Sequence, residues 1–456
     1  MVHQYKNNGY NIVLDVNSGQ VHIVDDIVYD LIPLIEEKRD AKSDYLFEKT
    51  GGRYPLEEIE EASGEIRELK KNGGLFTEDT FEPYINKFTE FKKEGGIVKA
   101  LCLHIAHDCN LRCRYCFASK GEYHGQKALM SYEVGKQALD FLIGHSGNRV
   151  NLEVDFFGGE PTMNFDVVKK LVAYGRSREE EANKKFRFTL TTNGILLNDE
   201  ILEFANKEMG NLVLSIDGRR DVNDRMRPTA SGSGSYDIIM PKFKKAADSR
   251  NQTNYYVRGT YTHYNTDFSE DVLHLHDCGF EQISVEPAVS DPKEDYALRE
   301  EDVPVLLEQY DLLAKEIIKR RKEGRFINFF HFMIDLEGGP CVAKRLSGCG
   351  AGGEYMAVTP WGDLYPCHQF VGNEEFKLGN VYDGVVNKEL SGKFTSCNVY
   401  TKAKCADCFA KFYCSGGCMA NSYNSTGDIN GNYELGCILQ RKRVECAIMI
   451  KAALSE

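Results

Sequence analysis

The 456-residue sequence has no stretch of about 18 consecutive apolar residues, which is close to the shortest run that spans a membrane as a helix. We therefore predict no transmembrane helix and no membrane partner. The first nine residues, MVHQYKNNG, also lack the apolar core of a secretory signal peptide. Together these absences favour a cytoplasmic protein.

An excess of positive charge is also missing, because the formal net charge is −13. Proteins that bind nucleic acid need a basic surface to neutralise phosphates, so we expect no nucleic-acid partner. In the reducing cytoplasm, disulfides are rare. The fifteen cysteines of the chain are therefore better explained by metal binding than by a disulfide framework.

Three of these cysteines form the motif C-x3-C-x2-C at Cys109, Cys113 and Cys116, directly after an apolar run at 99–106. Three thiolates on a four-iron cluster leave one iron free to bind a substrate or cofactor. A four-cysteine zinc site instead arranges its ligands as two pairs. Three buried structural cysteines are the alternative, but the two arginines among them make a poor core segment.

Between about residues 98 and 330, strand patterns alternate with helical patterns, which indicates βαβ units and a parallel sheet. Six units are too few for a closed eight-stranded barrel, so we predict an α/β fold with an open partial (β/α)6 barrel. Functional sites in such sheets lie at the carboxyl ends of the strands. The predicted strands are 100–106, 150–157, 186–192, 212–216, 255–262 and 282–286, and the helices are 132–143, 165–183, 199–207, 236–250, 269–277 and 303–322.

Several residues at these strand ends have side chains that suit a ligand. Gly158 and Gly159 would let the backbone approach a ligand closely, and Glu160 could receive an ammonium group. Each short motif alone is more often a simple turn, but their shared position at consecutive strand ends favours a site. The other candidates are Asn193 after the third strand, Ser215 and Asp217 after the fourth for ribose hydroxyls, and Arg258 in the fifth for a carboxylate.

The triad, with Tyr115 before its third cysteine, and Gly158-Gly159-Glu160-Pro161 resemble the signature of radical S-adenosylmethionine (AdoMet) enzymes over about residues 98–330. The resemblance implies a 4Fe–4S cluster on the triad, with AdoMet on the unique iron. An external low-potential donor would reduce the cluster, and AdoMet would then yield methionine and a 5′-deoxyadenosyl radical. The implied AdoMet contacts are Glu160 to the ammonium, the backbone near Tyr115 to adenine, and Asn193, Ser215, Asp217 and Arg258 to the ribose and carboxylate.

The C-terminal part holds a second concentration of cysteines, ten between Cys341 and Cys446. Its C-x2-C elements leave a four-cysteine zinc site open as an alternative. The motifs C-x12-G-x4-C and C-x2-C-x5-C-x3-C resemble the SPASM extension, which carries two auxiliary 4Fe–4S clusters and would make three clusters in all. The implied ligands are Cys349, Cys367 and Cys418 for the first auxiliary cluster, and Cys405, Cys408, Cys414 and Cys437 for the second.

One feature departs from the SPASM pattern. Seven residues separate Cys341 from Cys349, where the pattern has five. Either Cys341 is the fourth ligand of the first auxiliary cluster, or that cluster has an open iron for a substrate thiolate. The cysteines outside the pattern are predicted to be structural or core thiols: Cys102, Cys278, Cys397 and Cys446.

Residues 1–90 read as a separate module, before a main domain at 91–330 and a C-terminal domain at 331–456. Its patterns predict a hairpin at 10–16 and 20–24 and helices at 26–38, 41–49 and 55–71, followed by a polar linker at 76–93. A plain cap on the main domain is one interpretation. The module also resembles the winged-helix-like leader-recognition element of peptide maturases. A leader peptide would then add a strand along residues 11–16 or 20–24.

The segments CGAGGEY at 349–355 and YPCHQF at 365–370 are most similar to the maturases of six-cysteines-in-forty-five-residues (SCIFF) peptides. That resemblance implies thioether (sactionine-type) crosslinks in a precursor peptide that carries a leader. Anaerobic sulfatase maturases are the rival, but they carry a carboxylate where this chain has His368, which is either a general base or a hydrogen-bond partner near the cluster. A non-enzymatic iron–sulfur electron carrier would need no ligand pocket.

Overall fold

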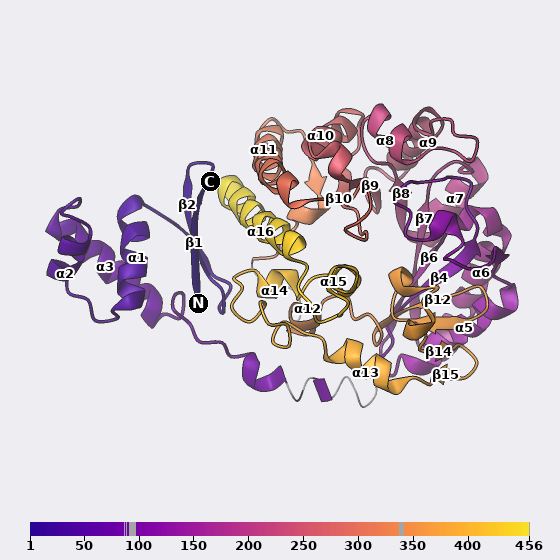
Figure 1. Ribbon diagram of the computed structural model, residues 1–456, viewed down its shortest axis with the longest axis horizontal. Helices are drawn as coiled ribbons and strands as arrows, with labels where there is room; N and C mark the ends of the chain where they lie inside the picture. Colours follow the sequence, from indigo (N-terminus) through magenta and orange to yellow (C-terminus); the bar gives the residue numbers. More distant parts are fainter. Residues whose placement is uncertain (86, 88, 91–96, 337–341, 456) are drawn as a thin grey trace.

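The computed structural model describes residues 1–85, 87, 89–90, 97–336 and 342–455. Figure 1 shows an N-terminal module at one end, joined to a larger body built on one long sheet. In the described part of the chain, no helix has the length and apolar character needed to cross a membrane.

The N-terminal module is a three-stranded antiparallel sheet with three helices beside it (Figure 1). Its strands are β1 (Val2–Asn7), β2 (Tyr10–Asp15) and β3 (Val21–Val24), and its helices are α1 (Asp26–Glu37), α2 (Ser43–Lys49) and α3 (Leu56–Lys71). Val13, Leu31 and Ile59 are fully buried in its core. The hairpin and helices were predicted, whereas β1 was not, because its sequence VHQYKN has few apolar residues.

The sheet order β1-β2-β3 corrects the predicted docking edge of the module. Residues 11–16 fall mostly in β2, which pairs with β1 on one side and β3 on the other. A strand paired on both sides has no backbone groups left for another strand, so the prediction for residues 11–16 is wrong. Among the described residues, β3 pairs only with β2, and its outer edge is open.

The body contains the predicted parallel sheet, and all six predicted strands and six predicted helices are present with small boundary shifts. The parallel strands are β4 (Ala100–His107), β6 (Asn151–Gly158), β7 (Lys185–Thr192), β8 (Met209–Ser215), β9 (Tyr255–Tyr261), β10 (Gln282–Pro287) and the short β11 (Asn328–Phe329). The helices are α5 (Tyr132–His145), α6 (Phe165–Ala182), α7 (Asp199–Glu208), α8 (Arg220–Met226), α9 (Tyr236–Ser249), α10 (Phe268–Asp277) and α11 (Val303–Lys322).

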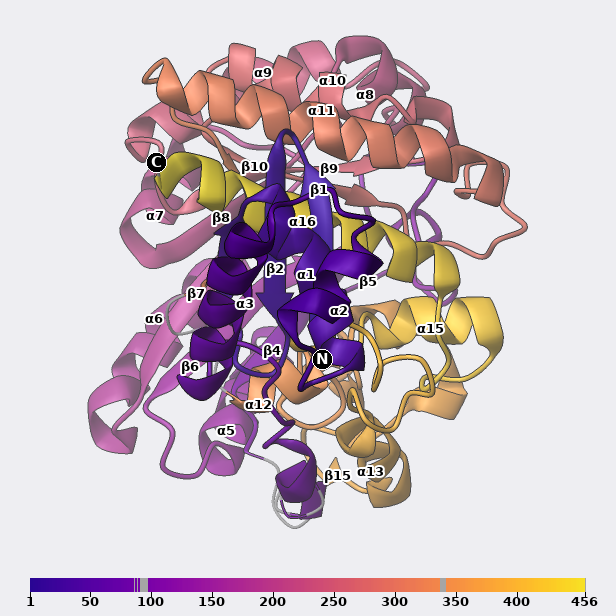
Figure 2. The same cartoon turned by 90° about the vertical axis from the view of Figure 1, so that its left-hand side faces the viewer.

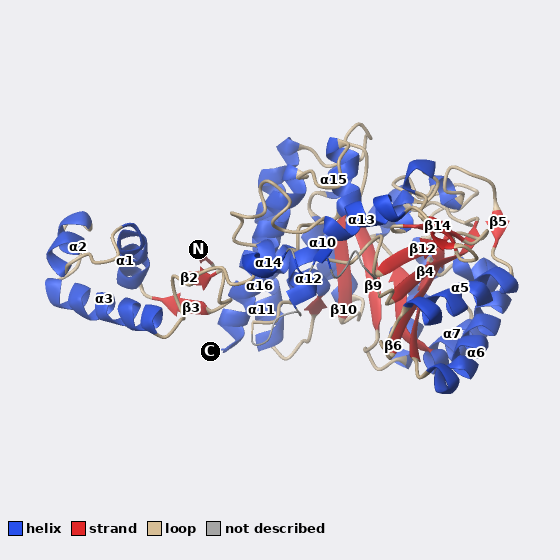
Figure 3. Cartoon of the chain, turned by 90° about the horizontal axis from the view of Figure 1, so that it is seen from below, coloured by secondary structure: helices blue, strands red, loops and turns tan. Residues whose placement is uncertain are grey.

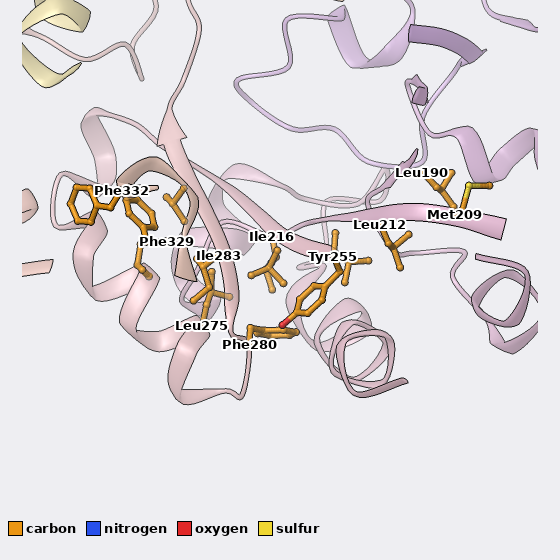
Figure 4. Packing of buried hydrophobic residues seen from close by; sticks show 14 of the residues in the cluster. Leu190, Met209, Leu212, Ile216, Tyr255, Leu275, Phe280, Ile283, Phe329 and Phe332 are labelled. Carbon is orange, nitrogen blue, oxygen red and sulfur yellow. The ribbon is translucent and has the colours of Figure 1, made fainter. Parts of the chain in front are cut away.

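Side-chain alternation in the strands explains how these layers form. In β7, Phe186, Phe188 and Leu190 are buried, whereas Lys185 and Arg187 are exposed. Figure 3 shows α5, α6 and α7 together on one side of the strands, and Figure 4 shows apolar side chains of the sheet packed towards the helices. Each fully buried large apolar side chain contributes about 1.5–3 kcal/mol to the free energy of folding. The many buried side chains of the sheet therefore hold its strand ends in place.

The C-terminal segment extends the same sheet beyond β4. Strand β12 (Tyr355–Val358) pairs in parallel with β4, and β13 (Asp363–Tyr365), β14 (Gly379–Asn380) and β15 (Gly384–Val385) follow antiparallel; β5 (Ala128–Leu129) also pairs with β4. The helices are α12 (Val342–Ser347), α13 (Lys388–Ser396), α14 (Lys411–Cys414), α15 (Met419–Thr426) and α16 (Glu434–Ser455). Helix α16 packs on α11 and on β1, so it joins the body to the N-terminal module (Figure 2).

Candidate functional site

The cysteine triad follows β4, at the carboxyl end of the sheet, as predicted. Burial raises the pKa of the Cys109 thiol to about 12 and that of Cys113 to about 11, and in both cases a neighbouring triad thiol adds to the shift. The sulfur atoms of Cys109, Cys113 and Cys116 therefore lie within electrostatic range of one another. Because buried thiolates need a compensating positive charge, this donor set suits a metal centre.

The backbone of a second segment holds the triad loop in place. The amide of Arg112 donates to the carbonyl of Pro228 at 2.8 Å, and the amide of Arg114 donates to that of Met226 at 2.9 Å. Leu111 also forms an antiparallel bridge with Thr229. Residues 226–229, here called the clip, begin at the last residue of α8 and fix the shape of the loop with backbone hydrogen bonds.

A network of three side chains, of which Asp217 and Arg227 are buried, connects the triad loop to β8 and to the clip. The Tyr115 hydroxyl lies 2.7 and 2.8 Å from the two oxygens of Asp217, and Arg227 Nη1 donates to the same hydroxyl at 2.8 Å. The amide of Thr260 donates to Asp217 at 3.0 Å. Burial raises the pKa of Asp217 to about 6, and Arg227 and the Tyr115 hydrogen bond oppose that shift. Asp217 is thus engaged by its own chain, and a ribose contact stays a prediction.

Glu160 is a buried carboxylate with four protein hydrogen bonds. Its Oε1 accepts from the Thr162 amide at 3.1 Å, the Thr162 hydroxyl at 2.5 Å and the Thr192 hydroxyl at 2.8 Å, and its Oε2 accepts from the Asn193 amide at 2.7 Å. Burial raises its pKa, and these hydrogen bonds partly offset the effect. Oε2 has lone-pair capacity left, so a ligand ammonium could still bind there.

The structure gives Gly158 and Gly159 a role that the sequence did not predict. A Cβ on Gly158 would lie 2.4 Å from the carbonyl oxygen of Ala106, and one on Gly159 would lie 2.1 Å from that of Asp108. The amides of Gly159 and Glu160 donate to these same two carbonyls at 2.7 and 2.9 Å. The glycines therefore let β6 approach the backbone that leads into the triad, and a ligand contact stays a prediction.

The remaining strand-end candidates lie at the same edge of the sheet, with different partners. Asn193 Nδ2 lies 3.5 Å from the Cys109 sulfur and donates to Asn110 Oδ1 at 2.8 Å, so it contacts the triad directly. Ser215, the last residue of β8, pairs in register with Arg258 of β9. Arg258 forms an ion pair with Glu286, so its carboxylate partner in this structure belongs to the same chain.

His368 lies between the triad loop and the C-terminal cysteines. Its ring is 5.3 Å from that of Phe117, which follows Cys116, and 5.1 Å from that of Phe157 at the end of β6. Nδ1 is 3.2 Å from the Tyr355 hydroxyl. Burial, with a smaller contribution from Arg258, lowers the pKa of His368 to about 4. The imidazole is therefore neutral near pH 7 and can accept one proton.

The C-terminal thiols fall into two groups. Burial raises the pKa of Cys367, and Cys418 and Cys349 add to the shift. Burial likewise raises the pKa of Cys414 to about 12, with further contributions from Cys437, Cys405 and Cys408. These neighbours coincide with the two ligand sets that the SPASM resemblance implies, although the ligand roles stay predictions. Cys341 lies outside the described residues, so its role as a fourth ligand is also untested.

The thiol groups suit an iron–sulfur cluster better than a single metal ion. In the described ranges, no three His, Cys, Asp or Glu side chains are close enough to hold a single metal ion. The thiol groups nevertheless fit an iron–sulfur cluster in donor type, since cysteine thiolates are its usual ligands. Outside the two groups, Cys102, Cys397 and Cys446 are buried as predicted for core thiols, and Cys278 is half-buried beside His274.

Sequence reasoning missed Arg227, Thr162 and Thr192. Arg227 is buried beside the triad loop, and the two threonines bind Glu160. Each is an ordinary residue type in a turn or strand, and no spacing sets it apart. The one available signal was position, because Thr192 ends the third predicted strand and Thr162 follows the second.

Comparison with known proteins agrees with this geometry. Residues 103–277 match the family model of the radical SAM superfamily. The cysteine-type anaerobic sulfatase-maturating enzyme of Clostridium novyi is 25% identical over 336 residues, which cover 69% of this chain and 86% of that enzyme.

Two solved structures share the fold at low sequence identity. Native anSMEcpe with bound AdoMet aligns with a TM-score of 0.63 and 18% identity, over 78% of this chain and 99% of that chain. Streptococcus suis SuiB bound to the precursor peptide SuiA aligns with a TM-score of 0.52 and 16% identity, over 94% and 97%. The match over residues 103–277, which include the triad at the end of β4, makes this part of the chain similar to the radical SAM superfamily.

Proposed function

We propose that this chain is a radical SAM peptide maturase that forms intramolecular cysteine thioether crosslinks in a ribosomally made precursor peptide of the SCIFF type. The observation that carries the proposal is the position of the triad beside Asn193 and Glu160. A further group of thiols includes Cys367, which directly precedes His368, and the His368 ring is 5.3 Å from the ring of Phe117 in the triad loop. When bound, a reduced 4Fe–4S cluster and AdoMet supply a 5′-deoxyadenosyl radical that removes a hydrogen atom from the peptide. An external low-potential electron donor completes the set of partners.

The residues of the chain have separate tasks in this proposal. Cys109, Cys113 and Cys116 hold the cluster, and Glu160 holds the AdoMet ammonium through its free lone pairs on Oε2. Asn193, Ser215 and Arg258 line the edge where the ribose and carboxylate of AdoMet would lie. His368 directly follows Cys367 and is neutral, so it can accept a hydrogen bond from a substrate thiol, whereas its pKa of about 4 makes it a weak base for that thiol.

The group of Cys349, Cys367 and Cys418 provides the place for the substrate sulfur. An auxiliary cluster with an open iron would bind that sulfur as a thiolate, because metal coordination lowers a thiol pKa. Sulfur–carbon bond formation on a carbon radical leaves one electron, which this auxiliary cluster would accept. The second group, Cys405, Cys408, Cys414 and Cys437, would hold the third cluster.

The N-terminal module supplies a surface for the leader of the precursor. The outer edge of β3 is unpaired within the described residues, and Ile23 on this strand is 47% exposed. An extended peptide can add to such an edge through backbone hydrogen bonds, with side-chain contacts giving specificity. SuiB, which shares the fold, likewise binds a precursor peptide, SuiA.

A second candidate is oxidation of a cysteine or serine to formylglycine in a sulfatase. The similarity to the Clostridium novyi enzyme over 69% of this chain favours it. Position 368 argues against it by analogy, because a neutral histidine stands where those enzymes carry a carboxylate. Both candidates use the same radical chemistry and differ in the bond that is made.

Anaerobic reconstitution followed by turnover distinguishes these functions. We expect about 12 irons per chain, four for each cluster. With dithionite, AdoMet and a six-cysteine precursor peptide, mass spectrometry should show loss of two hydrogen atoms and one alkylatable thiol per crosslink. A sulfatase-derived peptide offered in parallel should stay unchanged. A carbonyl at the former cysteine of that peptide, without crosslinks in the precursor, would establish the second candidate, and about four irons with bound zinc would contradict the auxiliary clusters.

A further inference from the structure

Arg227 is a buried cation with incomplete protein partners. Its side chain is 8% exposed, and its Nε has no hydrogen-bond partner among the described residues. Nη1 donates to the Tyr115 hydroxyl at 2.8 Å, and the distance to the Asp217 carboxylate is 4.0 Å. Burying a charge without a close counter-ion is costly, so a site of this kind requires a further negative group.

Asp217 compensates Arg227 only in part. Its carboxylate already accepts hydrogen bonds from Tyr115 and from the Thr260 amide, and its contact with Arg227 is long. Both charges meet at the hydroxyl of Tyr115, which stands between Cys113 and Cys116 in the triad loop. The network therefore presents two fixed charges of opposite sign to the loop that carries the proposed cluster ligands.

The clip makes this arrangement rigid. Arg227 lies between Met226 and Pro228, whose carbonyls accept hydrogen bonds from Arg114 and Arg112 of the triad loop. Tyr115, in the loop itself, joins Arg227 to Asp217 of the β8 end. The guanidinium and the cysteines are thus fixed relative to each other from both sides, by backbone and by side chains.

We propose that Arg227 and Asp217 set the reduction potential of the cluster at Cys109, Cys113 and Cys116, with Tyr115 and the clip as the positioning elements. The inference rests on the proposed cluster and concerns how the chain tunes it. A reduced cluster carries one more negative charge than an oxidised one, so a nearby fixed cation favours reduction and a nearby carboxylate opposes it. Arg227 thereby eases the electron transfer that must precede AdoMet cleavage.

A redox titration followed by electron paramagnetic resonance tests this proposal on the full-length, reconstituted chain. The cluster at the triad is identified as the signal that changes when AdoMet is added. Its reduction potential is measured before that addition, at a pH where Asp217 is ionised. We expect Arg227→Met to lower the equilibrium constant for one-electron reduction of this cluster about tenfold. This change is a shift of the reduction potential by ~59 mV in the negative direction. Asp217→Asn should shift the potential in the positive direction, and Arg227→Lys should stay close to wild type.

Arg225→Met is the matched control, because Arg225 is two residues away but exposed, with its guanidinium over the Tyr264 ring at 3.9 Å. Its charge is screened by water, so its loss should leave the potential unchanged. A structural role alone would not give shifts of opposite sign for Arg227→Met and Asp217→Asn.

Unchanged potentials, or shifts of the same sign in both variants, would overturn the proposal. If Arg227→Met fails to assemble a cluster, as judged by iron content and absorbance, the sign of the Asp217→Asn shift decides by itself. Absence of the proposed cluster is a separate outcome, because the wild-type chain would then show no AdoMet-responsive signal at all. Failure of the thioether proposal alone would leave that signal in place.

Discussion

The triad loop and the segment that carries the second cysteine group are held in contrasting ways. The triad loop is fixed by the chain itself, through the clip and the Tyr115–Asp217–Arg227 network. The segment 405–414 contains only the four-residue helix α14 and short turns. Its cysteines lie among one another rather than against a rigid strand end. The first site is therefore preorganised by the fold, whereas the second depends more on what its thiols bind.

The segment around residues 400–414 nevertheless contacts the N-terminal module. The His3 ring of β1 stacks on Phe409, next to Cys408, with 3.5 Å between ring centroids. Asp79, in the part of the module that follows α3, accepts hydrogen bonds from Tyr400 at 2.8 Å and from Lys411 Nζ at 2.8 Å. The least regular part of the body thus supports the module that we propose to bind the leader. Four changes test this contrast.

The largest expected effect is loss of chemistry at the first site without loss of fold. Cys113→Ala removes one of three cluster ligands, and we expect no detectable 5′-deoxyadenosine from dithionite and AdoMet. Because the clip bonds are made by the backbone of Arg112 and Arg114, the thermal unfolding midpoint of the metal-free chain should change little. Turnover by this variant would refute the site.

The second change removes a ligand where the fold offers less support. Cys408→Ser should lower iron content by about four per chain and destabilise residues 400–414, since metal binding there contributes folding free energy. Hydrogen exchange of residues 2–7 and 400–414, compared between the reconstituted variant and reconstituted Cys113→Ala, provides the measurement. Equal protection in the two variants would contradict the contrast between the sites.

The third change breaks the ion pair between the module and this segment. Lys411 has 4% of its side chain exposed and Asp79 has 17%, so Asp79→Ala leaves a buried ammonium without its carboxylate partner. We expect destabilisation by about 3–5 kcal/mol in denaturant unfolding. Asp26→Ala is the control, because the Lys6–Asp26 pair is 54% and 69% exposed and its loss should leave the stability almost unchanged.

The fourth and smallest change concerns ligand affinity at the first site. Glu160→Gln keeps the shape of the side chain, but its NH2 group must face at least one of the donors Thr162, Thr192 or Asn193. It also removes the negative charge for the AdoMet ammonium. We expect AdoMet to bind about 10- to 100-fold more weakly, as for the loss of a charged hydrogen bond, with cluster content retained. Isothermal titration of the reconstituted variant would show wild-type affinity if Glu160 does not contact AdoMet.

Much of the body could be predicted because its signals are local. The buried strands β6 and β7 and the amphipathic helices α6 and α7 have strong periodicity, so their residues identify the elements. The parallel order then places the strand ends together, which is why Glu160, Asn193 and Asp217 were selected. Strands β1 and β12 were missed, since β1 is polar and the four-residue β12 is ordered by pairing with β4.

The donor chemistry could be read from the amino-acid sequence: which thiols occur, at what spacing, and at the ends of which strands. What surrounds those thiols follows only from the tertiary structure. Arg227 becomes significant because the clip places it beside Tyr115, and Gly159 is required by the close approach of the Asp108 carbonyl. Hydrogen bonds, burial and fixed charge depend on residues distant in the chain, and no local pattern encodes their approach.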